Sequence, residues 1–127
     1  MELEALVVSA EAAAKGKIAD TLHGLVGIEK TTGEVMPDRA ITKLDARLQI
    51  IAYLLACRAG VILGMRERSD ANPDEISSAL GLDVRRTGEA LSRLKRVCVV
   101  RTTRGYEIPL ARVAAACEEI SSGRRTQ

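Results

Sequence analysis

The sequence predicts a mainly helical fold in which two short helices, joined by a tight turn, are followed by a small β-hairpin. Apolar residues recur at helical spacing in two successive runs, 76–80 and 84–97. Between the runs, Gly81 suits the left-handed conformation that ends a helix, and Asp83 suits the N-cap of the next one. Residues 99–108 then place two short apolar runs on either side of a polar tip, which is typical of a hairpin.

The segments before this unit are expected to supply supporting helices. Apolar or small residues from position 3 to about 26 follow the helical period and predict one long amphipathic helix. Residues 27–37 carry β-branched residues around a Thr-Thr-Gly turn signal, so we expect a loop with some extended structure, with a small hairpin as the alternative. A long apolar helix between about 42 and 67, beginning near Asp45, would cover the back of the two-helix unit.

The two-helix unit and the end of the chain follow in order. Asn72 is the expected N-cap of the first short helix, with Pro73 at its first position. The inward residues expected on the second helix are Val84, Leu91, Leu94 and Val97. Residues 110–120 predict an amphipathic helix, and 121–127 are expected to fray. The stripe expected on that last helix is Leu110, Val113, Ala114, Cys117 and Ile120.

The length of 127 residues favours one domain, 1–127. We divide it into an N-terminal helix and loop extension (1–41), a core (42–109) and a C-terminal helix with its tail (110–127). With two Tyr and neither Phe nor Trp, the core has to be aliphatic. The same composition removes the stacking platforms on which many single-strand and RNA binders depend.

Three cysteines, Cys57, Cys98 and Cys117, stand far apart in apolar surroundings and are expected to be small buried hydrophobes, although a disulfide stays open. Without a CxxC pair, and with His23 the sole histidine, we expect no metal site and no cofactor. The apolar run 48–63 is short for a bilayer and contains Arg58. We therefore expect a soluble, cytoplasmic protein without a membrane partner.

Positive charge is concentrated in residues 85–104. Seven Lys and Arg stand there against one acid, Glu89, which gives a local charge of +6. The whole chain carries +2, so the remainder carries −4. Such asymmetry is expected of a face that binds phosphates, because neutralised phosphates release the counterions condensed on a duplex.

Four groups of residues match a known pattern: Ile76 to Leu82, Leu91 with Leu94, Val99 to Arg101, and Arg104 to Tyr106. On these groups the chain resembles the winged helix-turn-helix family of bacterial and archaeal transcription regulators, of the general ArsR and MarR kind. The resemblance spans about a quarter of the chain. The chain departs from the family at Thr87, where an aliphatic residue is usual, at Cys98, where glycine is common, and at Gly88 within the second helix.

The resemblance implies that helix 84–97 lies in the major groove of double-stranded DNA and that the wing, 99–108, touches an adjacent groove or the backbone. It makes Arg85, Arg86 and Glu89 the candidates for base edges. The remaining candidates for DNA contact, on the helix and the wing, are Ser92, Arg93, Lys95, Arg96, Arg101, Thr102, Thr103 and Arg104.

The leading functional hypothesis is therefore a double-stranded DNA-binding protein that regulates transcription. The alternative is a winged-helix module that binds protein in a larger assembly without binding DNA. An enzyme is not expected, because no Ser/His/Asp arrangement, phosphate-binding glycine loop or metal cluster is present in the sequence. We also expect a homodimer through the N- and C-terminal helices. A ligand-sensing function stays open, because a cavity between the N-terminal and central helices would leave no sequence motif.

Overall fold

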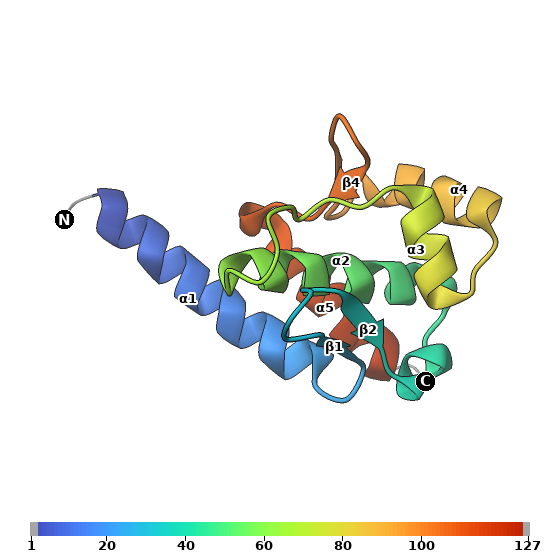
Figure 1. Cartoon of the computed structure of the whole chain (residues 1–127), viewed down its shortest axis with the longest axis horizontal. Coiled ribbons are helices and arrows are strands. Elements are labelled where there is room, and N and C mark those ends of the chain that lie inside the picture. The colour runs from blue at the N-terminus through green and yellow to red at the C-terminus, as the bar shows by residue number, and fades with distance from the viewer. Residues whose placement is uncertain (1–2, 126–127) are drawn as a thin grey trace.

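The computed structural model of the chain describes the backbone of residues 3–125 and the side chains of residues 10–125. Five α-helices and two antiparallel two-stranded hairpins make up these residues (Figure 1). The helices are α1 (Leu3–Leu22), α2 (Ala46–Ile62), α3 (Pro73–Leu80), α4 (Val84–Leu94) and α5 (Val113–Arg125). The strands are β1 (Val26–Ile28), β2 (Val35–Pro37), β3 (Val100–Arg101) and β4 (Tyr106–Glu107), and the short 3₁₀ helices are η1 (Arg39–Lys43) and η2 (Leu110–Arg112). The mainly helical class predicted from the sequence is confirmed.

The central helix α2 is the core of the molecule. Asp45 caps it by accepting a 2.9 Å hydrogen bond from the amide of Leu48, as the sequence predicted. Every residue from Leu48 to Cys57 is buried, because α1 and α5 pack on one side of α2 and α3 and α4 pack on the other (Figure 1). The helix ends earlier than the expected 67, since Gly64 takes a φ of +72° just after it.

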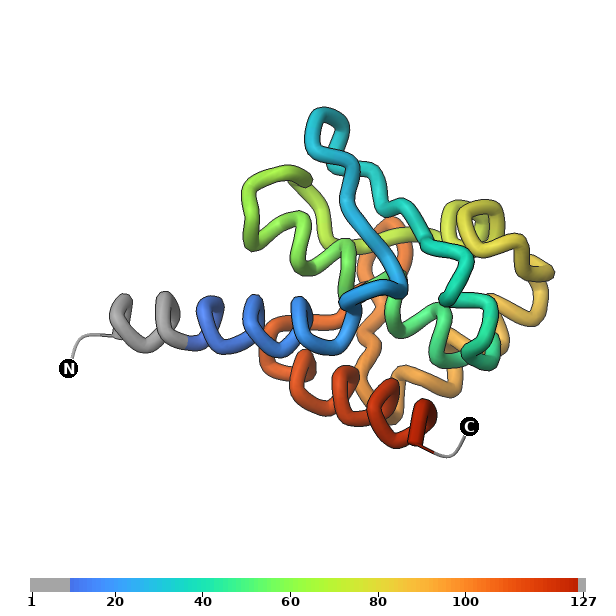
Figure 2. Tube along the Cα trace, turned by 90° about the horizontal axis from the view of Figure 1, so that it is seen from below, coloured from blue at the N-terminus to red at the C-terminus, as the bar shows by residue number. Residues whose placement is uncertain are grey.

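Helices α1 and α5 lie side by side and cover the lower face of α2 (Figure 2). Helix α1 ends at Leu22 rather than near Val26, because Gly24 turns the chain with a φ of +80° into strand β1. Helix α5 continues to Arg125, so the expected fraying from residue 121 is wrong as far as the described residues reach. The helix begins at Val113 and not at the expected Leu110, which lies in η2. Its buried stripe contains Ala116 in place of Ala114, which is exposed.

Residues 26–37 form a hairpin, so the expected loop is wrong and the alternative is correct. The register pairs Val26 with Pro37 and Ile28 with Val35. The carboxylate of Glu29 accepts hydrogen bonds from the amides of Thr31 and Thr32 at 2.8 and 2.6 Å, and these bonds hold the pKa of Glu29 below its ordinary value. This local turn closes the hairpin.

The turn between α3 and α4 forms as predicted. Asn72 caps α3 in a capping box with Glu75, and Pro73 occupies the first turn. Gly81 ends α3 in the left-handed region with a φ of +68°. Asp83 then caps α4 by accepting a 3.0 Å hydrogen bond from the amide of Arg86.

Two expectations for α4 are wrong. The helix ends at Leu94 instead of Val97, and the side chains of Val84 and Val97 are 45% and 36% exposed. The buried stripe runs through Thr87, Leu91 and Leu94 at i, i+4 and i+7, so Val84 lies at the margin of the buried face in the first turn. Thr87 tolerates burial because its hydroxyl donates to the carbonyl of Asp83 at 2.8 Å.

All three cysteines are buried and free. Burial raises the pKa of Cys57 to about 12 and that of Cys98 to about 11, so both thiols stay protonated at neutral pH. This confirms the prediction that they serve as small hydrophobes. Over the described residues, no helix has both the length and the hydropathy required to cross a membrane.

Candidate nucleic-acid interface

The outer face of α4 is polar and open to solvent. Arg85, Glu89 and Ser92 follow one another at i, i+4 and i+7, on the side opposite the buried stripe, and all three are exposed. Arg85 lies 3.6 Å from Glu89, measured from Nε to Oε1, and its side chain is 88% exposed. An ion pair this exposed adds little stability, so Arg85 is free to exchange it for another anion.

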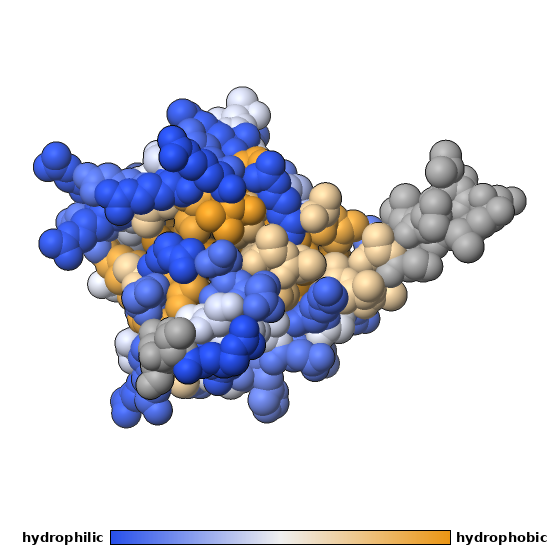
Figure 3. Space-filling model, turned by 180° about the vertical axis from the view of Figure 1, so that it is seen from behind, coloured by the Kyte–Doolittle hydropathy of each residue, from blue (hydrophilic) through white to orange (hydrophobic). Residues whose placement is uncertain are grey.

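The basic residues predicted for DNA contact are all exposed, and most of them lack an acidic partner. Among the described residues, Arg85 is the only one of the seven that forms an ion pair. The other six are Arg86, Arg93, Lys95, Arg96, Arg101 and Arg104. Figure 3 shows hydrophilic side chains projecting from the side of the molecule where α4 lies. Six of the seven positive charges are therefore left without an ion pair by the side chains that the structure describes.

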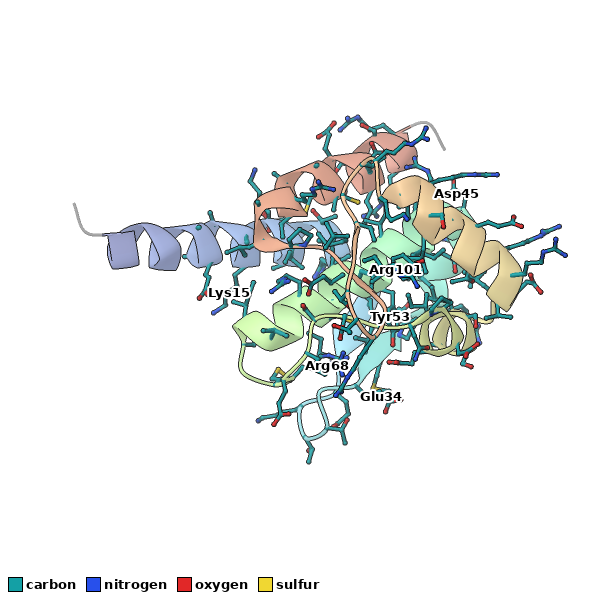
Figure 4. All side chains as sticks on the ribbon, turned by 90° about the horizontal axis from the view of Figure 1, so that it is seen from above. Lys15, Glu34, Asp45, Tyr53, Arg68 and Arg101 are labelled. Carbon is teal, nitrogen blue, oxygen red and sulfur yellow. The ribbon has the colours of Figure 1, made fainter. Side chains whose placement is uncertain are left out.

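The α3–α4 unit packs directly on α2. Ile76, Leu91 and Leu94 are at most 1% exposed and belong to one core cluster with α2. The β3–β4 hairpin stands on the same edge of the molecule as α4 (Figures 1 and 4), and Arg101, labelled in Figure 4, lies on its first strand. The helix and hairpin candidates are thus brought to one side.

The segment before α3 pairs with strand β4 of the hairpin through one antiparallel bridge. Ala71 and Tyr106 exchange both backbone hydrogen bonds, at 3.0 and 2.9 Å. Gly105 permits this approach, since a Cβ there would lie 2.3 Å from the carbonyl oxygen of Ala71. The hairpin is therefore attached directly to the chain that enters α3.

Asp70 fixes the tip of the hairpin. Its carboxylate accepts two hydrogen bonds from the guanidinium of Arg68, at 2.9 and 2.7 Å, and one from the hydroxyl of Thr102 at 2.6 Å. These bonds, with that from Arg68 the strongest, hold the pKa of Asp70 below its ordinary value. The Thr102 hydroxyl in turn accepts the amide of Gly105 at 3.1 Å.

A second cluster ties the base of the hairpin to α2. Arg58 donates from Nε to the carbonyl of Ile108 at 3.0 Å and from Nη2 to the carboxylate of Glu107 at 3.2 Å. The hydroxyl of Ser69 donates to the same carboxylate. The position of Arg58 within an apolar helix was visible in the sequence, but its partners could not be found without the fold.

The remaining candidates differ in what they offer a ligand. Ser92, Arg93 and Arg96 line a shallow hollow of about 290 Å³ at the C-terminal end of α4. Thr103 is exposed at the hairpin tip, whereas Thr102 is half-buried and its hydroxyl is engaged by Asp70 and Gly105. Thr102 therefore shapes the tip rather than offering a free hydroxyl.

Comparison of the chain with protein-family models, with curated proteins and with solved structures finds no match. In the described part of the chain, no group of three His, Cys, Asp or Glu residues is arranged to hold a metal ion. What defines the candidate site is thus its own geometry: an exposed basic helix face beside a braced hairpin.

Proposed function

We propose that this chain is a winged helix-turn-helix protein that binds double-stranded DNA and regulates transcription. The observation that carries the proposal is a set of six exposed basic residues on α4, just after it and on the β3–β4 hairpin, which have no acidic partner among the described residues. Such a set costs self-repulsion, and a polyanion relieves that cost. Duplex DNA is the polyanion that suits an exposed helix face, since its major groove is wide enough to admit a helix.

In this proposal α4 enters the major groove with its N-terminal half against the bases. Arg85 can pair in bidentate fashion with guanine O6 and N7, and Glu89 can accept from cytosine N4. Arg86 lies at the flank of the same turn. We assign to phosphates Arg93 in the last turn of α4, Lys95 and Arg96 just after the helix, and Arg101 and Arg104 on the hairpin.

The proposal includes a homodimer through α1 and α5, because a twofold dimer presents two recognition helices about one duplex turn apart. The buried stripe of α5 is covered by α1 and α2 within one chain, so the contact has to use the outer sides of both helices. Exposed alanines lie there, Ala12 and Ala13 on α1 and Ala114 and Ala115 on α5. Helix α1 also extends beyond the body of the molecule (Figure 1). Sedimentation giving a monomer at micromolar concentration would remove this part.

Selection from a random duplex library with the purified chain tests the proposal. We expect enrichment of a site with two related half-sites, since α4 reads bases and the chain is proposed to be a dimer. Enrichment of a single undivided site would support α4 as the reader and contradict the dimer. A library that stays random while the protein retains duplex at low salt would mean that this face contacts only phosphates.

A protein-binding module is the second candidate. Glu89 in the middle of the outer face repels phosphate, and the exposed apolar side chain of Val84 in the first turn of α4 suits a protein surface. Failure to bind any duplex at low salt would favour this candidate over the first.

A further inference from the structure

We propose that a pocket between α1, β1 and the end of α2 binds a small organic anion with an apolar tail, and that its occupancy changes the mobility of the β3–β4 hairpin. The regulatory part rests on the proposed function, whereas the binding part does not. Figure 2 shows α1, strand β1 of the β1–β2 hairpin and the end of α2 next to one another.

The pocket has the size and lining of a small-molecule site. Its volume is about 410 Å³, within the usual range for ligand pockets. Helix α1 contributes Ile18 and Leu22, strand β1 contributes Val26 and Ile28, and α2 contributes Ala59. Leu63, just after α2, completes the wall with a side chain that is 46% exposed. An apolar tail would cover that exposed surface.

The charge of the lining selects an anion. Lys15 and His23 both border the pocket, and none of the acidic residues whose side chains are described does. Lys15 projects from α1 beside the end of α2 (Figure 4), and it pairs with no acid whose side chain is described. A carboxylate or sulfonate can therefore take Lys15 as its partner while its tail lies against the apolar wall.

A continuous set of hydrogen bonds runs from the pocket to the hairpin. Met65 lines the pocket, and the amides of Met65 and Arg66 both donate to the carbonyl of Gly60, at 2.8 and 3.1 Å. The Arg66 side chain donates to the carbonyl of Arg68 at 3.2 Å. Arg68 binds Asp70, which holds the hairpin tip. A ligand that immobilises Leu63 and Met65 thus acts on the segment that braces the hairpin.

The experiment compares two fluorescent probes that differ in one group. 1-Anilinonaphthalene-8-sulfonate carries the anionic group, and N-phenyl-1-naphthylamine has the same aromatic frame without it. We expect one sulfonate probe per chain, displaced by octanoate. The Lys15→Gln substitution should lower the affinity for the sulfonate probe by about threefold, which is the size of an exposed ion pair, and leave the affinity for the neutral probe unchanged. Lys17→Gln, an exposed lysine of the same helix outside the pocket, is the matched control.

Filling the pocket is the second arm. Ala59→Phe should abolish binding of both probes, while Ala111→Phe at an exposed position of η2, outside the pocket, should not. Equal binding to Ala59→Phe and the native chain, or equal losses in Lys15→Gln and Lys17→Gln, would overturn the site. Because Lys15→Gln changes an exposed side chain, the test holds even if Ala59→Phe misfolds.

Hydrogen exchange tests the link to the hairpin without DNA. Octanoate should slow exchange in residues 100–107 as well as in those lining the pocket. Protection confined to the pocket would overturn the regulatory part. Absence of DNA binding together with a filled pocket would contradict the proposed function and leave the ligand site standing.

Discussion

The hydrogen bond between Asp70 and Thr102 offers the sharpest test of how the hairpin is positioned. The Thr102 hydroxyl donates to Asp70 at 2.6 Å, and the Asp70 side chain is only 11% exposed. A hydrogen bond to a charged acceptor contributes about 1.5–3 kcal/mol. Arg68 also binds this carboxylate, and because its side chain is 39% exposed, solvent screens part of that contribution. We therefore expect Asp70→Ala to lower the free energy of unfolding by about 2 kcal/mol.

A double-mutant cycle with Thr102→Val, measured by urea unfolding, isolates this bond. Removing either partner removes the same interaction, so the double variant should lose about 1.5–2 kcal/mol less than the sum of the two single losses. Asp70→Asn keeps an acceptor oxygen and should fall between the native chain and Asp70→Ala. Additivity of the two single losses, within about 0.4 kcal/mol, would refute the view that Asp70 fixes the hairpin tip.

Four further outcomes are expected. Because the pKa of Asp70 lies below its ordinary value of 3.8, the contribution of its carboxylate to stability is complete above about pH 4 and should disappear as pH falls through the folded-state pKa. The native chain and Asp70→Asn should therefore converge in stability at low pH, in acid titrations monitored by circular dichroism. In fluorescence anisotropy, Arg85→Ala should cost about 1–3 kcal/mol of binding free energy on a selected duplex and relax the sequence preference of the protein. Arg104→Ala should weaken binding to all duplexes alike. Gly105→Ala should destabilise the fold by about 1–3 kcal/mol, because the new Cβ meets a backbone carbonyl, and unchanged urea unfolding would contradict that clash. Gly88→Ala should instead raise the unfolding free energy by about 0.5–1 kcal/mol, since nothing lies within 4 Å of the new Cβ and alanine favours the helix.

Local signals predicted the elements well where one residue decides the backbone. Asn72, Pro73, Gly81 and Asp83 all act as their chemistry requires, because caps and turns depend on neighbours in the sequence. Helix ends were less accurate, as at Leu94, because they depend on where tertiary cover stops.

Side-chain orientation in α4 was predicted less well. Val84 follows the apolar spacing with Leu91, yet the buried stripe runs through Thr87, whose hydroxyl is satisfied by the backbone. Periodicity counts apolar residues and therefore passes over a threonine that buries its methyl group.

The candidate site shows the same limit. The basic residues on and just after α4 and on the hairpin were identifiable from charge alone, and all of them are exposed. The groups that brace the hairpin, Arg58, Asp70 and Glu107, act through contacts between residues far apart in the chain. Sequence spacing does not specify such contacts. The pocket likewise leaves no motif, since its walls are ordinary apolar residues of three separate elements.

The salt dependence of duplex binding tests the central claim most directly. Five basic side chains are assigned to phosphates, and each neutralised phosphate contributes about −0.9 to the slope of log affinity against log salt concentration. We expect a slope of about −4.5 per chain on a duplex. Undetectable binding at about 50 mM salt, or a slope shallower than about −1, would contradict the assignment of this face to DNA.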